Sequence, residues 1–524
     1  MTRHSCRSIS APGPAALAAL LVALGVSPSP AAAEPVDPTP TPVLTITGQP
    51  GQRIAVDTPP ERYATPSAAQ VSQTIYLNRC KGGCTVHMGN NDARTDTSTI
   101  PQPFTGNPGP DFVMSEFQNS ALQTGAAADA EWAMVVQCMK EVYSPYAVVV
   151  TDVRPANGQS FHEAIIAGLP QDVGLSDMIL GVAPLASNCS AIDNVMSFTF
   201  ANHHMASATD PSVLVLNVCW TAAQESAHAY GLDHEYTFVS GNALNNHSAC
   251  NDPMTYRNDC GGEKFFRNET ANCGETVNRA CKCGGTQNSH LKMLAVFGAG
   301  TPITGNPTSA LMSLTAGGPL GVAVSVQAGA KRGISHVDLL LNGYNWSSKP
   351  GAIIGTTGQA NPSTYALPVP AEVPNSIVDV KAVAYDDLGA STESAVVTVT
   401  KGAPCASAST CLKGQKCESG KCFWDPPTGE IGDACSYPQF CKSGLCTGTS
   451  DQQICTQNCI PGVSDSCPAN SGLTCLMQSP NQGVCFYETT GGGCCSVADR
   501  GGMWWAPIVL GLAVLGWITR RRRR

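Results

Sequence analysis

The pattern of hydrophobic and polar positions predicts one long, mostly apolar helix in the first half of the chain, over residues 212–230. Asp210 and Pro211 precede it as an N-cap residue and a proline at the first helical position. Gly231 follows, and its tolerance of a left-handed backbone predicts that the helix ends there and the chain turns back. The apolar pattern also predicts a helix over 127–142 and strands over 74–78, 147–153, 178–182 and 195–200.

The pattern changes between residues 307 and 402, where apolar positions alternate in short runs separated by turns. This spacing predicts a β-sandwich, and the runs 378–385 and 396–399 resemble the closing strands of bacterial Ig-like modules. No residue there indicates chemistry, so we expect a spacer or adhesive module. Its strands are predicted over 320–327, 337–341, 364–369, 378–385 and 395–400.

Cysteine usage indicates an oxidising compartment. Ten of the 25 cysteines lie between Cys80 and Cys283 and twelve between Cys405 and Cys485, with none in the segment between the two groups. Even counts predict that each module closes its own disulfides. Residues 403–487 contain no C-x2-C pair and no histidine, so we favour six disulfides over zinc for this small disulfide-rich module. A disulfide loop is also favoured over metal for Cys80-x3-Cys84.

The two ends of the chain are predicted to direct export and attachment. Residues 1–33 have a positive start, an apolar core and a small-residue cleavage site, as in a signal peptide. Residues 34–70 are rich in Pro and Thr and are expected to form a linker. Residues 503–519 have the length and interfacial tryptophans of a transmembrane helix, and a buried core helix is the weaker reading because nothing follows to cover it. The arginines of 520–524 are expected to stay cytoplasmic.

The segment 493–524 carries Cys494 and Cys495, then the short apolar span, then the arginine run. This order resembles the MYXO-CTERM sorting tail of myxobacterial surface proteins. The resemblance implies that Cys494 or Cys495 is a processing or lipid-attachment site and that the protein is retained at the cell surface. A plain membrane anchor is the alternative, and the sequence does not distinguish it from a sorting tail.

The exported part of the chain is acidic. Residues 34–493 carry 22 Lys and Arg against 38 Asp and Glu, a net charge of −16. An acidic, disulfide-bearing exterior argues against nucleic acid as a partner.

The helix over 212–230 ends in the stretch that carries the candidate chemistry. Gln224 and His228 are i and i+4 partners on one helix face, Glu225 lies beside them, and the turn at Gly231 would bring His234 to His228. The spacing follows H-E-x-x-H-x-x-G-x-x-H, in which three histidines bind zinc and the glutamate serves as general base. In this chain the first histidine of that pattern is Gln224.

This stretch resembles the metzincin clan of zinc metallopeptidases, in particular its matrixin-like members. A Met-turn is also expected in that clan, and residues 252–256 have its form. The resemblance covers residues 71–302 and implies an α/β domain that binds Zn²⁺ and hydrolyses a protein or peptide substrate by metal-activated water. By the resemblance, His228 and His234 are metal ligands, Gln224 stands at the third ligand position, Glu225 is the general base, Met254 is the floor of the site and Tyr256 stabilises the reaction intermediate.

Gln224 departs from the pattern, and three hypotheses follow. A carbonyl oxygen is a harder donor than imidazole, so zinc should bind more weakly. The first hypothesis is an active, surface-anchored metallopeptidase that uses Gln224, or His203 or His204, as third ligand. The second is an inactive metzincin-fold protein that acts as a binding or adhesion module. The third treats the stretch as coincidence in an adhesive surface protein.

Overall fold

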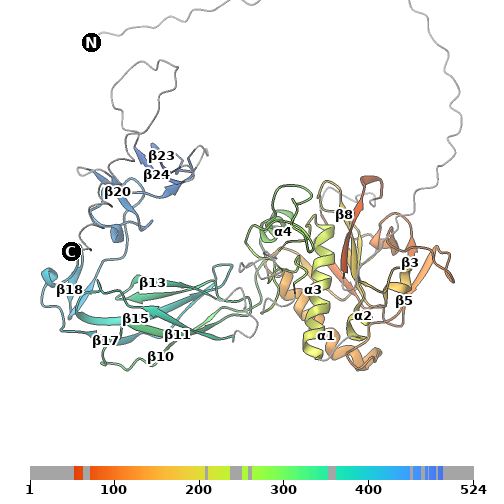
Figure 1. Ribbon diagram of the computed structural model, residues 1–524, viewed down its shortest axis with the longest axis horizontal. Helices are drawn as coiled ribbons and strands as arrows, with labels where there is room; N and C mark the ends of the chain where they lie inside the picture. The colour runs from red at the N-terminus through yellow and green to blue at the C-terminus, as the bar shows by residue number, and fades with distance from the viewer. Residues whose placement is uncertain are drawn as a thin grey trace, which may run out of the picture. The chain divides into compact units, whose positions relative to one another are not determined.

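The computed structural model is a β-rich chain of several domains with a disulfide-rich C-terminal region (Figure 1). It describes residues 52–62, 71–206, 210–236, 251–257, 262–351, 361–448, 452–461, 466–469, 471–479 and 482–487.

The first domain contains a six-stranded sheet in the order β1-β8-β9-β7-β2-β6. Neighbouring strands are parallel except β8 and β9, which are antiparallel. β7 is buried along its whole length although it begins with His162 and Glu163, so its polar start conceals a central strand from sequence reading. The strands are β1 (Gln52–Thr58), β2 (Thr74–Asn78), β6 (Val149–Thr151), β7 (His162–Ile166), β8 (Ile179–Ala186) and β9 (Met196–Thr199).

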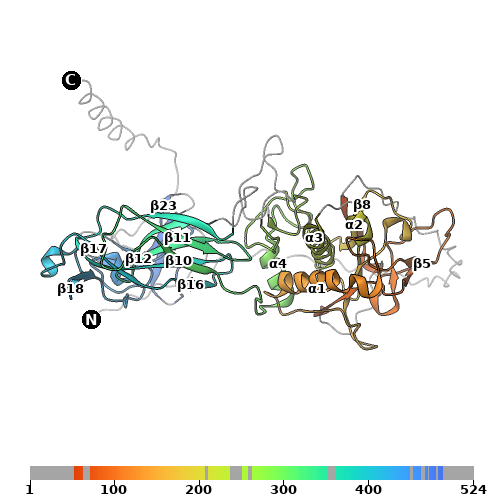
Figure 2. The same cartoon turned by 90° about the horizontal axis from the view of Figure 1, so that it is seen from below.

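Two long helices, α1 (Asp129–Tyr143) and α3 (Pro211–Ala229), lie side by side on the sheet (Figures 1 and 2). The disulfide between Cys138 and Cys219 joins them. The predicted start of α3 is confirmed, because the Asp210 side chain accepts the Ser212 backbone N–H at 2.9 Å. Two shorter helices are α2 (Ala201–Ala206) and α4 (Ser289–Phe297).

β1 lies within residues 34–70, which the sequence predicts to be a linker. The structure differs there, because Gln52–Thr58 pair with β8 over their whole length. Composition favours an extended chain in this stretch, and only the edge of β8 turns that extended chain into a strand. The other strands of this domain form a small separate sheet of β3 (Cys84–Met88), β4 (Thr97–Ser98) and β5 (Asp111–Met114).

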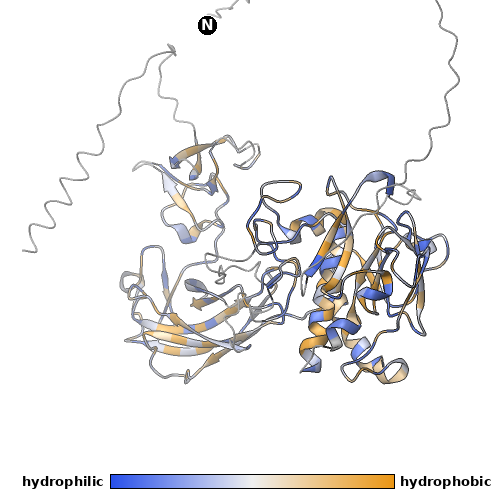
Figure 3. Ribbon diagram, turned by 45° about the vertical axis from the view of Figure 1, so that its right-hand side comes forward, coloured by the Kyte–Doolittle hydropathy of each residue, from blue (hydrophilic) through white to orange (hydrophobic). Residues whose placement is uncertain are grey.

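The second domain is a β-sandwich, as predicted. A three-stranded sheet, β10-β11-β14, packs against a larger sheet built on β12 and β15, and buried side chains of both form one core. Apolar and polar residues alternate along its strands, as Figure 3 shows. The strands are β10 (Thr308–Met312), β11 (Ala323–Gly329), β12 (His336–Leu341), β13 (Tyr344–Pro350), β14 (Ser363–Pro368), β15 (Ser376–Tyr385), β16 (Ser391–Glu393) and β17 (Val397–Lys401).

The third region confirms the prediction of six disulfides. In each of its two Cys-x5-Cys-x4-Cys repeats the first cysteine pairs with the third: Cys411 with Cys422, and Cys435 with Cys446. The other four bridges are Cys405–Cys417, Cys441–Cys455, Cys459–Cys475 and Cys467–Cys485. Its short strands are β18 (Lys416–Glu418), β19 (Lys421–Phe423), β20 (Cys446–Gly448), β21 (Gln453–Cys455), β22 (Asn458–Cys459), β23 (Leu473–Ser479) and β24 (Gln482–Tyr487).

Within the residues that the structure describes, no helix is both long enough and apolar enough to cross a membrane. The predicted signal peptide, the predicted span over 503–519 and the candidate sorting residues Cys494 and Cys495 lie outside the described residues.

Candidate functional site

The last turns of α3 place three polar side chains in the protein interior. Gln224, Glu225 and His228 have no solvent exposure. Gly231 has φ +86°, and a side chain at that position would collide with the Cys189 carbonyl oxygen. The helix therefore ends at Ala229 and the chain reverses, as the sequence predicts.

The reversal brings His234 against His228. Their Nε2 atoms lie 2.9 Å apart and their rings are nearly perpendicular. His228 Nδ1 lies 2.7 Å from the Leu232 carbonyl oxygen, and His234 Nδ1 lies 2.8 Å from a Glu275 carboxylate oxygen. Both of these oxygens can only accept a hydrogen bond, so each Nδ1 carries the proton.

The facing Nε2 atoms then both present lone pairs in a buried space. Two lone pairs at 2.9 Å repel each other unless a proton or a cation lies between them. Burial, followed by the neighbouring His234, lowers the pKa of His228 to about 3. Burial therefore disfavours a proton shared between the two Nε2 atoms. Two imidazole nitrogens are ligands that suit a metal cation.

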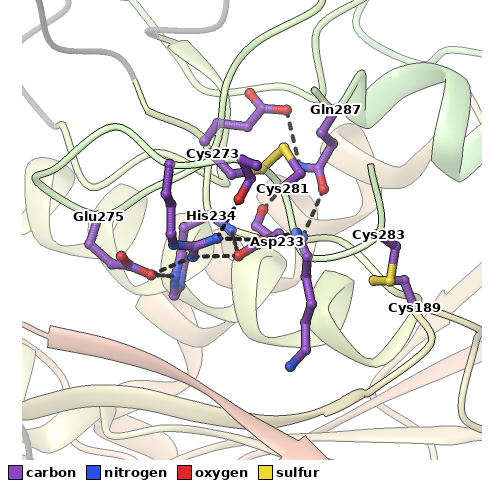
Figure 4. A network of polar contacts seen from close by, with 12 residues as sticks. Cys189, Asp233, His234, Cys273, Glu275, Cys281, Cys283 and Gln287 are labelled. Carbon is purple, nitrogen blue, oxygen red and sulfur yellow. Dashed lines mark hydrogen bonds and ion pairs between the residues drawn. A yellow bond between two sulfur atoms is a disulfide. The ribbon is translucent and has the colours of Figure 1, made fainter. Parts of the chain in front are cut away.

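Glu275 orients His234, and sequence reasoning missed it. It lies in the loop closed by the Cys273–Cys281 disulfide, and its hydrogen bond from His234 holds the pKa of Glu275 below the usual range. Figure 4 shows Glu275 beside His234 in this network. A loop carboxylate far along the chain carries no sequence signal of its own. A carboxylate that fixes a ligating histidine is a common companion of metal sites.

Arg279 connects Glu275 to Asp233. Its guanidinium donates to both carboxylate oxygens of Asp233, at 2.6 and 2.7 Å, and to Glu275 at 2.9 Å. Asp233, His234 and Glu275 also bring ligand-type atoms within 4.8 Å of one another. Because Arg279 already pairs with both carboxylates, we infer that Asp233 and Glu275 serve to orient His234.

The predicted Met-turn lies next to Gln224. Met254 is fully buried, its N–H donates to Asp252, and its carbonyl oxygen accepts Gln224 Nε2 at 3.2 Å. This bond fixes the amide of Gln224 and leaves its Oε1 buried with no hydrogen-bond partner among the described residues. The free oxygen is the atom by which Gln224 would replace an imidazole as ligand.

Glu225 is the other buried group with unused acceptors. Neither carboxylate oxygen has a hydrogen-bond partner among the described residues, and burial raises the pKa of Glu225 well above its usual range. Its side chain lies against Gly181 of β8, where an added methyl group would lie 2.6 Å from Oε1. Sequence reasoning missed Gly181, although a lone glycine inside a strand pattern is a signal of such a close approach.

Tyr256 packs edge-on against the ring of His234. The two ring centroids are 4.9 Å apart, and the Tyr256 hydroxyl accepts the Arg53 N–H at 3.0 Å and donates to the Arg53 carbonyl oxygen. A cleft of about 340 Å³ opens beside these residues. The cleft is lined by residues of both charges: Arg53, Asp57, Asp233, Glu275, Arg279 and Lys282.

The predicted site residues thus fall into two groups. His228 and His234 come together, with Gln224 one turn before His228, and Glu225, Met254 and Tyr256 adjoin them. His203 and His204 lie on α2, where burial, followed by the charges of Arg53 and His203, lowers the pKa of His204 to about 3. Their role as a third ligand stays a prediction.

Comparisons with known proteins add little to this geometry. No protein-family profile matches the chain, and no curated protein sequence matches it. Among solved structures, the fibronectin(III)-like modules of Clostridium thermocellum CbhA are 23% identical over 18% of this chain, with a TM-score of 0.14. An endo-β-1,4-mannanase double mutant from Cellulomonas fimi is 12% identical over 52% of this chain, with a TM-score of 0.13. The chain spans 47% and 60% of the lengths of these proteins.

Proposed function

We propose that residues 71–302 form a metzincin-like zinc peptidase domain that hydrolyses peptide bonds. The observation that carries the proposal is the pair of facing Nε2 lone pairs on His228 and His234, which lie 2.9 Å apart in a buried space. Beside them the Glu225 carboxylate has no hydrogen-bond partner among the described residues. Three atoms would hold the ion: His228 Nε2, His234 Nε2 and Gln224 Oε1. When bound, zinc supplies Lewis-acid polarisation of a carbonyl and acidifies water.

Glu225 is the general base of the proposed reaction. Burial raises its pKa, so the carboxylate can accept a proton from water and later donate it to the leaving amine. Gly181 allows the carboxylate to lie against β8, because an added methyl group there would be 2.6 Å from Glu225 Oε1. Glu275 and the Leu232 carbonyl oxygen hold the two imidazoles in the tautomer that exposes Nε2.

We further propose that the protein is exported and held at the cell surface. The disulfides in the first domain and in the C-terminal region fit an oxidising exterior, where a peptidase would meet protein or peptide substrates. Attachment is proposed through the span over 503–519 or through a lipid-modified Cys494 or Cys495, and nucleic acid is not an expected partner of the acidic body.

An inactive binding module is the alternative function. The observation that favours it is Gln224, whose amide nitrogen is already used by the Met254 carbonyl oxygen and whose neutral oxygen is a weaker ligand than imidazole. On this alternative the domain keeps the fold and binds protein or glycan at the surface without turnover.

Metal content and peptide hydrolysis by the full-length exported chain separate the two. We expect bound zinc and hydrolysis of a quenched fluorescent peptide mixture, with a loss of about 10²–10⁴-fold in Glu225→Ala and no loss in the exposed control Glu372→Ala. Equal hydrolysis in Glu225→Ala and wild type would contradict the proposed role of this carboxylate. Zinc without hydrolysis in the wild type would favour the binding module.

Gln224→His tests the ligand set directly. A third imidazole should raise zinc affinity by about tenfold or more if Gln224 occupies a ligand position. Titration against a competing chelator measures the change, and Gln137→His on the exposed face of α1 is the control for adding a histidine. No rise in affinity would contradict the assignment of Gln224.

A further inference from the structure

The β-sandwich places a carboxylate against the first domain. Asp387 follows β15, and its side chain is only 7% exposed. It lies between two buried arginines, Arg267 of the first domain and Arg332 of the sandwich. Within the described part of the chain, both arginines form their ion pairs with Asp387. A module that the sequence predicts to be a spacer thus shares a buried charge cluster with the domain that carries the candidate site.

The hydrogen bonds of Asp387 are short and involve both of its oxygens. Arg332 donates from Nε and Nη2 to the two carboxylate oxygens, at 2.7 and 2.8 Å. Arg267 donates from Nη1 to Asp387 Oδ2 at 2.9 Å and to the Arg332 carbonyl oxygen at 2.7 Å. The centre of the Phe265 ring lies 4.5 Å from Arg332 Cζ and 5.4 Å from Arg267 Cζ. One carboxylate therefore holds two guanidinium groups in place.

The two arginines depend on this carboxylate because they are buried. Burial would raise the pKa of Asp387, but Arg267 and Arg332 hold it below its usual range, so the carboxylate stays ionised. Burial lowers the pKa of Arg267, and Asp387 opposes that shift. Without Asp387, two buried cations would face each other, which is a costly arrangement.

Arg267 joins this cluster to the start of the predicted Met-turn. Its backbone N–H donates to Asp252 Oδ2 at 2.7 Å, and its Nε donates to the Asn251 carbonyl oxygen at 3.2 Å. Asp252 Oδ1 accepts the Met254 N–H at 2.8 Å. Arg267 therefore contacts the sandwich with the end of its guanidinium and the Met-turn with its backbone and Nε.

The Met-turn, in turn, contacts both segments of the candidate site. The Met254 carbonyl oxygen accepts Gln224 Nε2 at 3.2 Å and the Glu235 N–H at 3.0 Å. Glu235 follows His234 in the chain. This one oxygen therefore fixes Gln224 and also the backbone next to His234, so a shift of the Met-turn would move both residues relative to His228.

A second ion pair joins the sandwich to the helix layer. Lys331 of the sandwich pairs with Glu141 near the end of α1, and it lies 3.8 Å from Glu263. α1 packs against α3, whose last turns carry the candidate site. The sandwich thus contacts the first domain on α1 as well as at Arg267, and the two domains belong to one compact unit of the chain.

We propose that Asp387 is a positioning residue of the candidate metal site: it holds Arg267, and Arg267 holds the Met-turn against Gln224 and the residue after His234. The inference rests on the proposed function and extends the catalytic unit from residues 71–302 into the β-sandwich. The sandwich is then part of the peptidase rather than a spacer. No local pattern marks this contact, because Asp387 and Arg267 are 120 residues apart.

The test compares Asp387→Asn with Arg332→Met in the full-length exported chain. Asp387→Asn weakens the hold on Arg267. Arg332→Met breaks the same buried cluster, but it leaves Asp387 to Arg267 and keeps the backbone carbonyl at position 332. It therefore reproduces a loss of stability without the loss of the contact that leads to the Met-turn. Glu393→Gln removes an exposed ion pair with Lys381 on the sandwich and controls for the loss of a surface charge.

We expect Asp387→Asn to bind zinc about tenfold more weakly than the wild type, as for other groups that orient metal ligands. Competition with a chelator, at a temperature at which every variant is folded, measures the affinity. Hydrogen exchange of residues 251–257 should become faster in the same variant, since the Met-turn is less firmly held. Arg332→Met and Glu393→Gln should match the wild type in both measurements, although thermal unfolding should show that Arg332→Met is less stable.

Arg267→Lys covers the case in which Asp387→Asn does not fold. A lysine keeps a cation for Asp387 but lacks the Nε that donates to the Asn251 carbonyl oxygen. Zinc affinity should fall and the exchange of residues 251–257 should become faster, as in Asp387→Asn. Wild-type values of both in Arg267→Lys would overturn the inference.

The outcomes distinguish this inference from the proposed function. Zinc affinity and hydrogen exchange that Asp387→Asn leaves unchanged, or that Arg332→Met alters equally, overturn the positioning role and leave the peptidase. An absence of zinc in the wild type contradicts the peptidase, whereas faster exchange confined to Asp387→Asn still supports the hold of Asp387 on the Met-turn.

Discussion

The Glu225 carboxylate lies against Gly181, so closely that a methyl group at 181 would be 2.6 Å from Glu225 Oε1. Gly181 also pairs with Arg53 of β1, so the two strands and the helix carboxylate meet at this residue. The position of Glu225 therefore depends on a residue with no side chain.

Gly181→Ala should displace Glu225 and reduce peptide hydrolysis by about 10²-fold or more, since a misplaced general base loses most of its effect. Zinc content should stay close to that of the wild type, because Gly181 has no ligand atom. Steady-state hydrolysis and metal analysis of the purified chain measure the two effects.

Gly285→Ala is the matched control, because an added methyl group there meets no atom within 4 Å. A wild-type rate of hydrolysis in Gly181→Ala would mean that the helix and strand accommodate the methyl group without displacing Glu225. That result would contradict the positioning role of Gly181.

Glu275→Ala should lower zinc affinity by about 10–100-fold, the usual effect of removing the group that orients a ligating histidine. The His234 Nδ1–H would lose its acceptor at 2.8 Å, and the imidazole could then turn or change tautomer. Competition with a chelator measures the affinity. Val277→Ala, in the same loop and 74% exposed, should leave the affinity unchanged. Equal zinc affinities in Glu275→Ala and Val277→Ala would contradict the role of Glu275 in orienting His234.

Local signals in the sequence predict the helix of the site. The Asp210 cap, Pro211 and the left-handed Gly231 each act on the helix turn next to them. The structure accordingly places the ends of α3 within one residue of the predicted bounds. The disulfide modules follow from even cysteine counts, whereas the pairing of Cys417 with Cys405 depends on how two neighbouring loops meet.

Long-range contacts account for what the sequence did not predict. β1 is a strand because β8 offers it an edge more than 120 residues later, as the pairing of Arg53 with Gly181 shows. Glu275 acts on His234 only because the disulfide-closed loop returns to the helix end. No local pattern in either segment carries that information.

Glu163, outside the site, gives a pH dependence of stability. It is fully buried on β7, accepts Asn78 Nδ2 at 2.7 Å and lies 3.8 Å from Arg154. Burial raises the pKa of Glu163 from 4.5 to about 8. The folded chain therefore holds a proton that the unfolded chain releases above about pH 4.5. The stability that this proton contributes is complete below that pH and is lost as the pH rises toward 8.

Glu163→Gln imitates the protonated side chain at every pH, so it should remove this loss. We expect the variant to gain stability relative to the wild type between pH 5 and pH 8, by on the order of 2 kcal/mol or more, since each pKa unit corresponds to about 1.4 kcal/mol. Urea unfolding at a series of pH values measures the difference. Glu372→Gln, an exposed carboxyl on the sandwich, should follow the wild type throughout. Parallel pH curves for Glu163→Gln and the wild type would show that Arg154 keeps Glu163 ionised in the folded chain.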